Sequence, residues 1–327
     1  MSNSKVGLAV PTYNAEPYLD AWIKSLKMQS FCPHRILAID SESKDGTRDI
    51  CTQQNFEVHR IKQRDFDHGG TRQLAVELLD DCDILVFMTQ DAIMSSSDSL
   101  SNLLAPFDNP ETAAVCGRQL PSKDAGPIAA HARLFNYADS NQVKTKNDIS
   151  KFGFKTIFLS DSFAAYRRNT LLNAGGFPKR SIFGEDTVVA AKLILAGYSI
   201  AYRSDASVYH SHNYSLFEEF NRYFDIGVLH NRESWLREEF GGAEGEGKRF
   251  VLSELKYLTH TAPLLIPSAL LRTFAKLGGY KLGMNERRLS VNSKRALSMN
   301  RRFWIDEIEA GKLESHLPNR ERKTKNV

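Results

Sequence analysis

The first ninety residues alternate short apolar runs with helical patterns, and this alternation limits the fold more than any other feature. The apolar runs are VGLAV (6–10), RILAID (35–40), FEVHRI (56–61) and DILVFM (83–88). The segments between them carry apolar residues at three- and four-residue spacing, as residues 19–26 do. Strands that alternate with helices form βαβ units, whose right-handed crossovers produce a mostly parallel sheet covered on both faces. We therefore expect an α/β fold of the nucleotide-binding type.

Polar residues directly follow each of these strands. They form the segments PTYN (11–14), DSESKDGT (40–47), RDFDHGGTR (64–72) and TQDA (89–92). In open parallel sheets, ligands bind beyond the carboxyl ends of the strands. The four segments therefore predict one crevice that is lined by Asp, His, Arg, Thr and Gly.

Three of these segments and a later GED (184–186) stand in an order and spacing that resembles the family-two glycosyltransferases. Members of that family are inverting enzymes built on the nucleotide-sugar-binding sheet called the GT-A fold. The resemblance covers about residues 5–240 and implies a mostly parallel central sheet flanked by helices. Within the family, FDHGGTR (66–72) is similar to the bacterial rhamnosyltransferases that build O-antigen and other surface polysaccharides.

The chemistry of the family requires a divalent cation and a base, because a nucleoside diphosphate leaves while a hydroxyl group is deprotonated. Mg²⁺ or Mn²⁺ binds oxygen ligands and retains substrate phosphate and water, so one or two carboxylates suffice. The usual DxD motif is Thr89, Gln90 and Asp91 here, which implies Asp91 as a metal ligand and Gln90 as a donor contact. His210 is the implied second ligand, with His212 at strand spacing beside it. A solvated strand end is the alternative for Asp91.

The resemblance also implies which residues hold the nucleotide. Pro11 and Thr12 line one side of the base, and Asp40 holds it from the other side. Asp45 and Gly46, in the loop after Asp40, are better explained by turn geometry.

The segment RDFDHGGTR predicts an anion site for the donor. Gly69 and Gly70, which follow Asp67, let the backbone approach a ligand closely. We expect Thr71 to begin a helix whose free amides suit an anion, and Arg72 to add a fork of donors. The alternative is an ordinary helix start with a solvated charge.

Inversion requires in-line attack, so the catalytic base lies on the side of the sugar opposite the diphosphate. The resemblance implies Asp186 as the base and Glu185 as its neighbour in the donor site, with Asp161 in a loop that contacts sugar and acceptor. The acid pair follows Gly184 at a predicted helix start, where capping is the alternative role. We expect the helix N-terminus to lower the pKa of Asp186 and keep it ionised.

The second half of the chain mixes strands and helices. We expect a strand over 154–168, short and longer helices over 169–177 and 184–198, a strand over 199–210, and one or two helices over 215–240. The glycine-rich segment 241–248 is the best linker. We therefore divide the chain into a GT-A domain of residues 1–240 and a basic, mainly helical C-terminal region of residues 241–327.

The C-terminal region carries most of the positive charge. Residues 270–327 contain 14 Lys and Arg against 6 Asp and Glu, although the whole chain has a formal charge of only +4. An apolar stripe with basic flanks runs along the predicted helix and comprises Leu270, Leu271, Phe274 and Leu277, flanked by Arg272, Lys276 and Lys281. Such a helix can lie on an anionic membrane surface, and a helix that packs on the catalytic domain is the alternative.

Other classes of protein are disfavoured by composition. No segment approaches the roughly 20 apolar residues of a spanning helix, and the basic tail lacks the interleaved aromatics of a nucleic-acid-binding module. The four cysteines form no CxxC pair, which argues against structural zinc and for a reducing compartment, with each cysteine a buried small residue. We expect a cytoplasmic protein, peripheral on the inner face of the cytoplasmic membrane.

The resemblance predicts a metal-dependent inverting hexosyltransferase of lipopolysaccharide O-antigen synthesis. Its implied donor is dTDP-β-L-rhamnose, and its implied acceptor is a hydroxyl group of a polyprenyl-diphosphate-linked glycan. Another nucleotide hexose, such as UDP-glucose or UDP-galactose, is the alternative donor. A catalytically silent nucleotide-sugar-binding scaffold subunit is the alternative class of protein.

Overall fold

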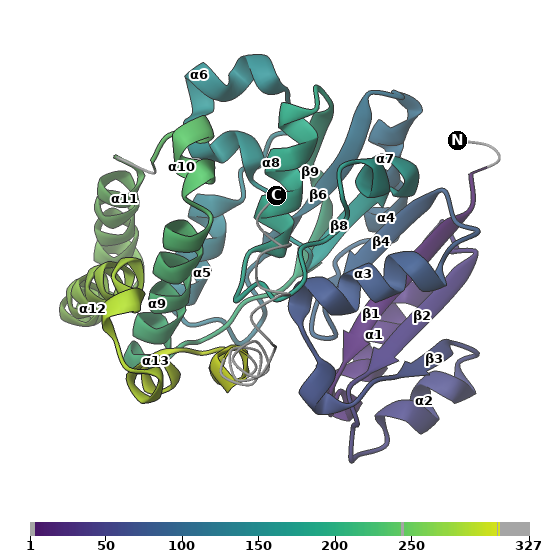
Figure 1. Cartoon of the computed structure of the whole chain (residues 1–327), viewed down its shortest axis with the longest axis horizontal. Coiled ribbons are helices and arrows are strands. Elements are labelled where there is room, and N and C mark those ends of the chain that lie inside the picture. The colour runs from purple at the N-terminus through teal and green to yellow at the C-terminus, as the bar shows by residue number, and fades with distance from the viewer. Residues whose placement is uncertain (1–3, 243–244, 306, 308–327) are drawn as a thin grey trace, which may run out of the picture.

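The computed structural model describes residues 4–242, 245–305 and 307, and one mixed sheet dominates them (Figure 1). The strands of this sheet are β1 (Val6–Thr12), β2 (Arg35–Asp40), β3 (Glu57–Arg60), β4 (Ile84–Met88), β5 (Ile93–Met94), β6 (Thr112–Leu120), β7 (Gln142–Lys144), β8 (Phe163–Arg167) and β9 (Ser199–Tyr209). Their order across the sheet is β3-β2-β1-β4-β8-β6-β9-β5, with β7 paired to β9.

Parallel pairing brings the polar strand ends together. Strands β3, β2, β1 and β4 are parallel, and β6 is parallel to β9. Strand β8 runs antiparallel to both β4 and β6, so β4 and β6 share one direction. The carboxyl ends of β1, β2, β4, β6 and β9 therefore lie along the same edge of the sheet. This arrangement confirms the predicted α/β fold.

Helices cover both faces of the sheet. They are α1 (Glu16–Lys27), α2 (Thr47–Gln53), α3 (His68–Leu78), α4 (Ser99–Leu104), α5 (Pro127–Asn136), α6 (Ile149–Phe152), α7 (Arg168–Asn173), α8 (Glu185–Leu195), α9 (Leu216–Arg232), α10 (Ser234–Phe240), α11 (Glu246–Thr261), α12 (Ile266–Met284) and α13 (Val291–Leu297). Trp22 of α1 and Leu100 of α4 lie in one core cluster, and Val76 of α3 and Val189 of α8 lie in the other.

Three details differ from the sequence expectations. Strand β6 was not predicted, because burial on both faces leaves no alternation of apolar and polar residues. The strand expected over 154–168 is confined to β8, since Gly153 (φ 53°) ends α6 and a 3₁₀ turn then carries Ile157 into the core. Among the cysteines, Cys32 is exposed rather than buried.

The helices beyond the glycine-rich segment pack directly on the preceding ones. Figure 1 shows α9 to α13 grouped on the side of the sheet away from β1, β2 and β3. Helix α12 lies against α9 through Gly279 and Gly283, where a Cβ atom would overlap the backbone of α9. Helix α11 packs on α5 through Phe250 and Phe135. The boundary at residue 241 stays a prediction, and residues 243–244 and 308–327 lie outside the described residues.

In the part of the chain that the structure describes, no helix is both long enough and apolar enough to cross a membrane.

Candidate active site

The ends of β1 and β2 form the first part of the site. Thr12 pairs in register with Asp40, and its hydroxyl lies 3.5 Å from a carboxylate oxygen of Asp40. The same carboxylate accepts the backbone N–H of Ser43 at 3.1 Å and lies 3.8 Å from Nε of Arg48. Pro11 precedes Thr12 at the strand end. The structure therefore places Pro11, Thr12 and Asp40 together, with the Asp40 side chain almost fully buried.

Gln90 has a structural role between the ends of β1 and β4. Its side-chain oxygen accepts the backbone N–H of Tyr13 at 2.9 Å, and its side-chain nitrogen donates to the carbonyl of Tyr13 at 3.2 Å. Both ends of the amide are thus used within the chain. A donor contact from Gln90 stays a prediction, and these two bonds fix the loop that carries it.

Asp91 faces two histidines beyond the end of β9. Its Oδ2 lies 3.4 Å from Nε2 of His210 and 3.9 Å from Nε2 of His212. One ligand atom from each of the three side chains falls within 4.8 Å of the others. Burial raises the pKa of Asp91, but His210, Thr89 and His212 together outweigh burial and hold that pKa below its ordinary value. Burial and His210 lower the pKa of His212 to about 4, so its imidazole is neutral.

Gln119 of β6 fixes the orientation of His210. Its side-chain oxygen lies 2.9 Å from Nδ1 of His210, and its side-chain nitrogen donates to the hydroxyl of Ser160 at 2.9 Å. Because an amide oxygen only accepts, Nδ1 carries a proton, and Nε2 is the ring nitrogen that faces Asp91. Arg133 of α5 also donates to the His210 carbonyl at 2.8 Å. Gln119 was not found from the sequence.

A buried acidic cluster lies beside these residues. The backbone N–H of Thr89 donates to the carbonyl of Ser162 at 3.4 Å, which brings the segment before β8 next to the end of β4. Asp161 in that segment forms an ion pair with Arg72 of α3 at 2.9 Å, and Glu185 of α8 forms another with the same guanidinium at 2.8 Å. Arg72, Asp161 and Glu185 are all buried.

Asp186 lies at the open side of this cluster. One of its oxygens accepts the backbone N–H of Asp161 at 3.3 Å, and the other accepts the backbone N–H of Thr187 at 2.7 Å. Unlike Asp161 and Glu185, it is only partly buried. Burial and the neighbouring charge of Glu185 raise the pKa of Asp186 to about 6. The expected lowering by the helix N-terminus is therefore wrong, because those two effects outweigh the helix dipole.

The loop before α3 is held by contacts within the chain. Asp67 caps α3 by accepting the N–H of Gly70 at 2.7 Å, and the same oxygen accepts the N–H of Arg180. A Cβ atom on Gly69 would overlap the carbonyl oxygen of Pro178, which explains this glycine without a ligand. The helix begins at His68, three residues before the expected Thr71. Asp67, Gly70 and Arg72 thus have partners within the chain, and the anion site predicted from Asp67, Gly69, Gly70 and Arg72 stays a prediction.

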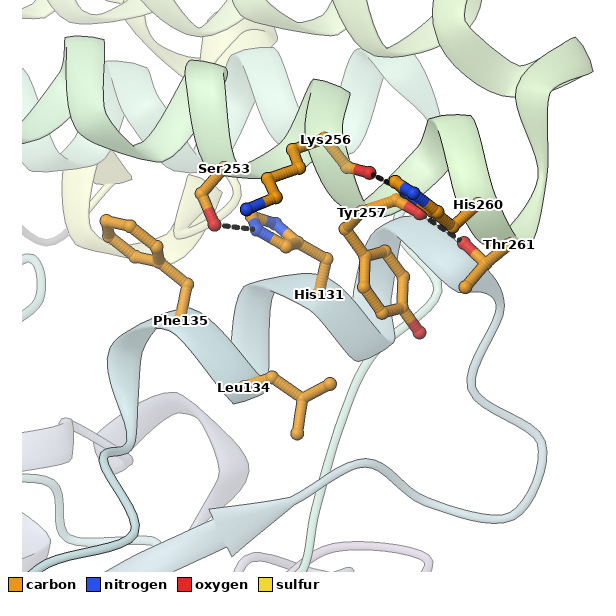
Figure 2. Close-up of a pocket in the computed structure, with 8 residues that line it drawn as sticks. All are labelled: His131, Leu134, Phe135, Ser253, Lys256, Tyr257, His260 and Thr261. Atoms are coloured by element: carbon orange, nitrogen blue, oxygen red, sulfur yellow. Dashed lines mark hydrogen bonds between the residues drawn. The ribbon is translucent and has the colours of Figure 1, made fainter.

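A separate cavity of about 380 Å³ lies between α5 and α11. Figure 2 shows His131 of α5 facing Ser253 and Lys256 of α11, with Tyr257 beside it. The Nε2 atom of His131 lies 3.0 Å from the Ser253 hydroxyl. None of the strand-end residues lines this cavity, so it is distinct from the crevice at the sheet edge.

Comparison with known proteins identifies the family. The model described as Glycosyl transferase family 2 matches residues 8–173. The chain belongs to this family. The O-antigen chain rhamnosyltransferase RfbN of Salmonella typhimurium is 49% identical over 92% of this chain and 96% of its own length. WbaN of Salmonella anatum, described in the same words, is 47% identical over 91% and 95%.

Solved structures share the fold at low identity. Mannosyltransferase PcManGT from Pyrobaculum calidifontis, in complex with GDP-Man and Mn²⁺, gives a TM-score of 0.53 at 18% identity over 93% of this chain and 85% of that one. Residues 1–349 of S. aureus TarS, in complex with UDP-GlcNAc, give 0.53 at 17% identity over 87% and 91%. The predicted GT-A fold and glycosyltransferase activity are confirmed. The role of each site residue in this family-two glycosyltransferase stays a prediction.

Proposed function

We propose that this glycosyltransferase transfers L-rhamnose, with inversion, from dTDP-β-L-rhamnose to a hydroxyl group of a lipid-linked glycan in O-antigen synthesis. The observation that carries this proposal is the similarity to two O-antigen chain rhamnosyltransferases over nearly the whole chain. The site supports it, because the carboxylates and imidazoles at the sheet edge suit a nucleotide-sugar donor and an acceptor hydroxyl.

Asp91, His210 and His212 fit a divalent cation. A carboxylate and two imidazoles whose ligand atoms lie within 4.8 Å of one another can converge on one ion. Of the two expected ions, Mn²⁺ suits this set better than Mg²⁺, which prefers oxygen ligands. When bound, the cation neutralises the charge of the leaving diphosphate. The similar structure of PcManGT was determined with Mn²⁺.

We expect Gln119→Leu to weaken Mn²⁺ binding by about 10- to 100-fold, because loss of the hydrogen bond frees the His210 ring. Isothermal titration with Mn²⁺ measures the change, and Gln119→Glu is the matched control because it keeps an oxygen acceptor for Nδ1. Equal Mn²⁺ affinity in the wild type and Gln119→Leu would remove Gln119 from this role.

Asp186 is the proposed catalytic base. It is the partly buried acid of its cluster, and two backbone N–H groups fix its side chain. A pKa of about 6 leaves it ionised at neutral pH, yet makes it a stronger base than an ordinary aspartate. In this proposal, Asp186 accepts the proton of the acceptor hydroxyl as that oxygen attacks the sugar.

The nucleotide is proposed to bind at the ends of β1 and β2. Pro11, Thr12 and Asp40 lie together there, and Asp40 keeps acceptor capacity for an N–H group of the base. Arg72 is not part of this proposed nucleotide site, because its guanidinium is buried between two carboxylates.

A donor screen tests the proposed reaction. The full chain is incubated with Mn²⁺ or Mg²⁺, a lipid-linked acceptor fraction and one of dTDP-L-rhamnose, UDP-glucose and UDP-galactose, and released nucleoside diphosphate is measured. We expect dTDP-L-rhamnose to give the highest kcat/KM. Preference for either UDP-hexose would replace the proposed donor while leaving the glycosyltransferase activity in place.

The proposed acceptor is lipid-linked, and α12 offers an apolar surface for a membrane. Leu271, Phe274 and Leu277 are 56%, 70% and 50% exposed, and Leu264 just before the helix is 92% exposed. Two of the expected basic flanks are not free, however. Arg272 and Lys276 form ion pairs with Glu219 of α9 at 3.3 and 3.6 Å. Apolar insertion therefore contributes more than charge to the proposed contact.

We expect the full chain to sediment with liposomes of anionic lipid. In the double variant with Leu271→Ser and Phe274→Ser, the bound fraction should fall by about tenfold for each apolar side chain that is lost. Val143→Ser is the matched control, since Val143 is 60% exposed on β7. Added salt should reduce liposome binding only modestly, because two of the flanking cations, Arg272 and Lys276, are already paired with Glu219. Equal recovery of the wild type in the supernatant with and without liposomes would exclude the membrane contact.

A further inference from the structure

Arg72 is a buried cation that touches two of the three acids around the proposed base. Its side chain is 6% exposed and projects from α3. Nε lies 2.9 Å from Oδ2 of Asp161, and one terminal nitrogen lies 2.8 Å from Oε1 of Glu185. The same terminal nitrogen donates to the carbonyl of His68 at 3.1 Å, which fixes the guanidinium against its own helix.

Both carboxylates held by Arg72 lead directly to Asp186. The backbone N–H of Asp161 donates to an Asp186 oxygen at 3.3 Å, and the Asp161 side chain accepts the Tyr166 hydroxyl at 2.5 Å. Glu185 precedes Asp186 in the first turn of α8. Three elements, α3, the segment before β8 and α8, therefore meet at one guanidinium.

We infer that Arg72 is a positioning residue of this enzyme: held between Asp161 and Glu185, it fixes both segments that carry or contact Asp186 and limits the negative charge around that carboxylate. This inference rests on the proposed role of Asp186 as the base. Arg72 acts through its neighbours, because its buried guanidinium does not reach the substrate crevice.

The charge balance explains why one cation matters. Three carboxylates share a single arginine, and burial leaves little solvent to screen them. Burial raises the pKa of Glu185, but Arg72, His68, a backbone N–H group and Arg222 together outweigh burial and hold that pKa below its ordinary value. Burial, opposed by Arg72, raises the pKa of Asp161. For Asp186, the charge of Glu185 raises the pKa and that of Arg72 lowers it.

Other titratable or charged groups act on the cluster from the elements packed around it. They are His68 on α3, Cys116 on β6, Tyr137 after α5, Tyr166 on β8 and Arg222 on α9. Burial raises the pKa values of Cys116, Tyr137 and Tyr166, so these three are neutral near pH 6. Burial lowers the pKa of His68. Arg72 and Glu185 are therefore the pair whose charges decide the ionisation of Asp186.

The pH dependence of turnover tests this inference. Because Asp186 must be ionised to accept a proton, kcat falls on the acid side of its pKa. Loss of the Arg72 charge raises the pKa of Asp186, so we expect Arg72→Gln to move the acid limb of the pH–kcat profile to higher pH by about one pH unit or more. Loss of the Glu185 charge has the opposite effect, so Glu185→Gln should move the acid limb to lower pH by a similar amount. The double variant should return the limb close to the wild-type position.

Controls separate positioning from general damage. Arg168→Lys is the matched control, because Arg168 also binds the α3 backbone, at the carbonyl of Val76, but does not touch the acids. It should keep the wild-type acid limb. Thermal unfolding and nucleoside diphosphate binding are measured on every variant, and if Arg72→Gln does not fold, the shift in Glu185→Gln alone decides.

Two outcomes distinguish this inference from the proposed function. If Asp186→Asn is inactive but the acid limb is unchanged in folded Arg72→Gln and Glu185→Gln, Asp186 remains the base and the positioning role of Arg72 is overturned. If Asp186→Asn keeps wild-type turnover, the proposed base itself is wrong, and the inference is overturned with it.

Discussion

Replacement of Asp186 by Asn should reduce kcat by about 10²- to 10⁴-fold while donor affinity changes little. The amide keeps an oxygen that accepts the backbone N–H of Asp161 or Thr187, so the loop geometry is preserved. What it loses is the ability to take a proton from the acceptor hydroxyl. Steady-state kinetics with saturating donor, together with titration of nucleoside diphosphate, separates the lost chemical step from lost binding.

The matched control for Asp186→Asn is Glu218→Gln. Glu218 is also a first-turn carboxylate, and it accepts the backbone N–H of Ser215 at the start of α9. It should retain near wild-type turnover. The wild-type rate should also decline below about pH 6, where Asp186 takes up a proton. A turnover in Asp186→Asn equal to that of Glu218→Gln would show that another group accepts the proton.

Local patterns in the sequence predicted the sheet and the strand-end residues. A strand can be predicted from an apolar run without knowledge of distant contacts. The residues that follow each run then lie at the edge of the sheet. The runs placed Asp40, Asp91 and His210 at strand ends, and the structure has Asp40 as the last residue of β2, His210 directly after β9 and Asp91 three residues after β4. The start of α8 was predicted from its glycine and acids, whereas the role of Asp186 as base came from the family resemblance.

Contacts between distant segments could not be predicted from local patterns. Gln119 and His210 are separated by 91 residues, and nothing around Gln119 marks it as a partner of a histidine. Arg72 beside two glycines suggested an anion from outside, whereas its partners Asp161 and Glu185 come from later parts of the same chain. A buried cation and a ligand-binding cation have the same sequence signature, because burial is a property of the tertiary fold.

The stripe on α12 illustrates the same limit. Four residues, Leu270, Leu271, Phe274 and Leu277, were predicted to share a face, and the structure exposes all four. The face toward α9 combines small residues with the polar groups of Arg272, Lys276 and Tyr280, so it forms no hydrophobic pattern in the sequence. Ala269, Gly279 and Gly283 are buried there, toward α9.

We expect Gly283→Ala to destabilise the protein by about 1–3 kcal/mol, the usual cost of forcing an added atom into close packing. A Cβ atom at this position would overlap the carbonyl oxygen of Phe224, and backbone cannot move aside as a flexible side chain can. Gly278→Ala is the matched control on the same helix. Its Cβ atom would meet only the Phe220 ring at 3.6 Å, so the higher helix propensity of Ala should leave stability unchanged or raise it by up to about 1 kcal/mol.

Gly283→Ala should also reduce activity, because α9 connects the C-terminal helices to the segment that precedes Asp186. Asp225 of α9 accepts the Ser298 hydroxyl at 2.6 Å and the backbone N–H of Asn300 at 3.1 Å, and the Asn300 side chain donates to the carbonyl of Ile182. Ile182 lies four residues before Asp186. Denaturant unfolding and kcat measured on Gly278→Ala and Gly283→Ala therefore test the packing and its link to the site together. Equal stability of the two variants would contradict the close contact between α9 and α12, whereas lower stability with unchanged kcat would separate that contact from the catalytic loop.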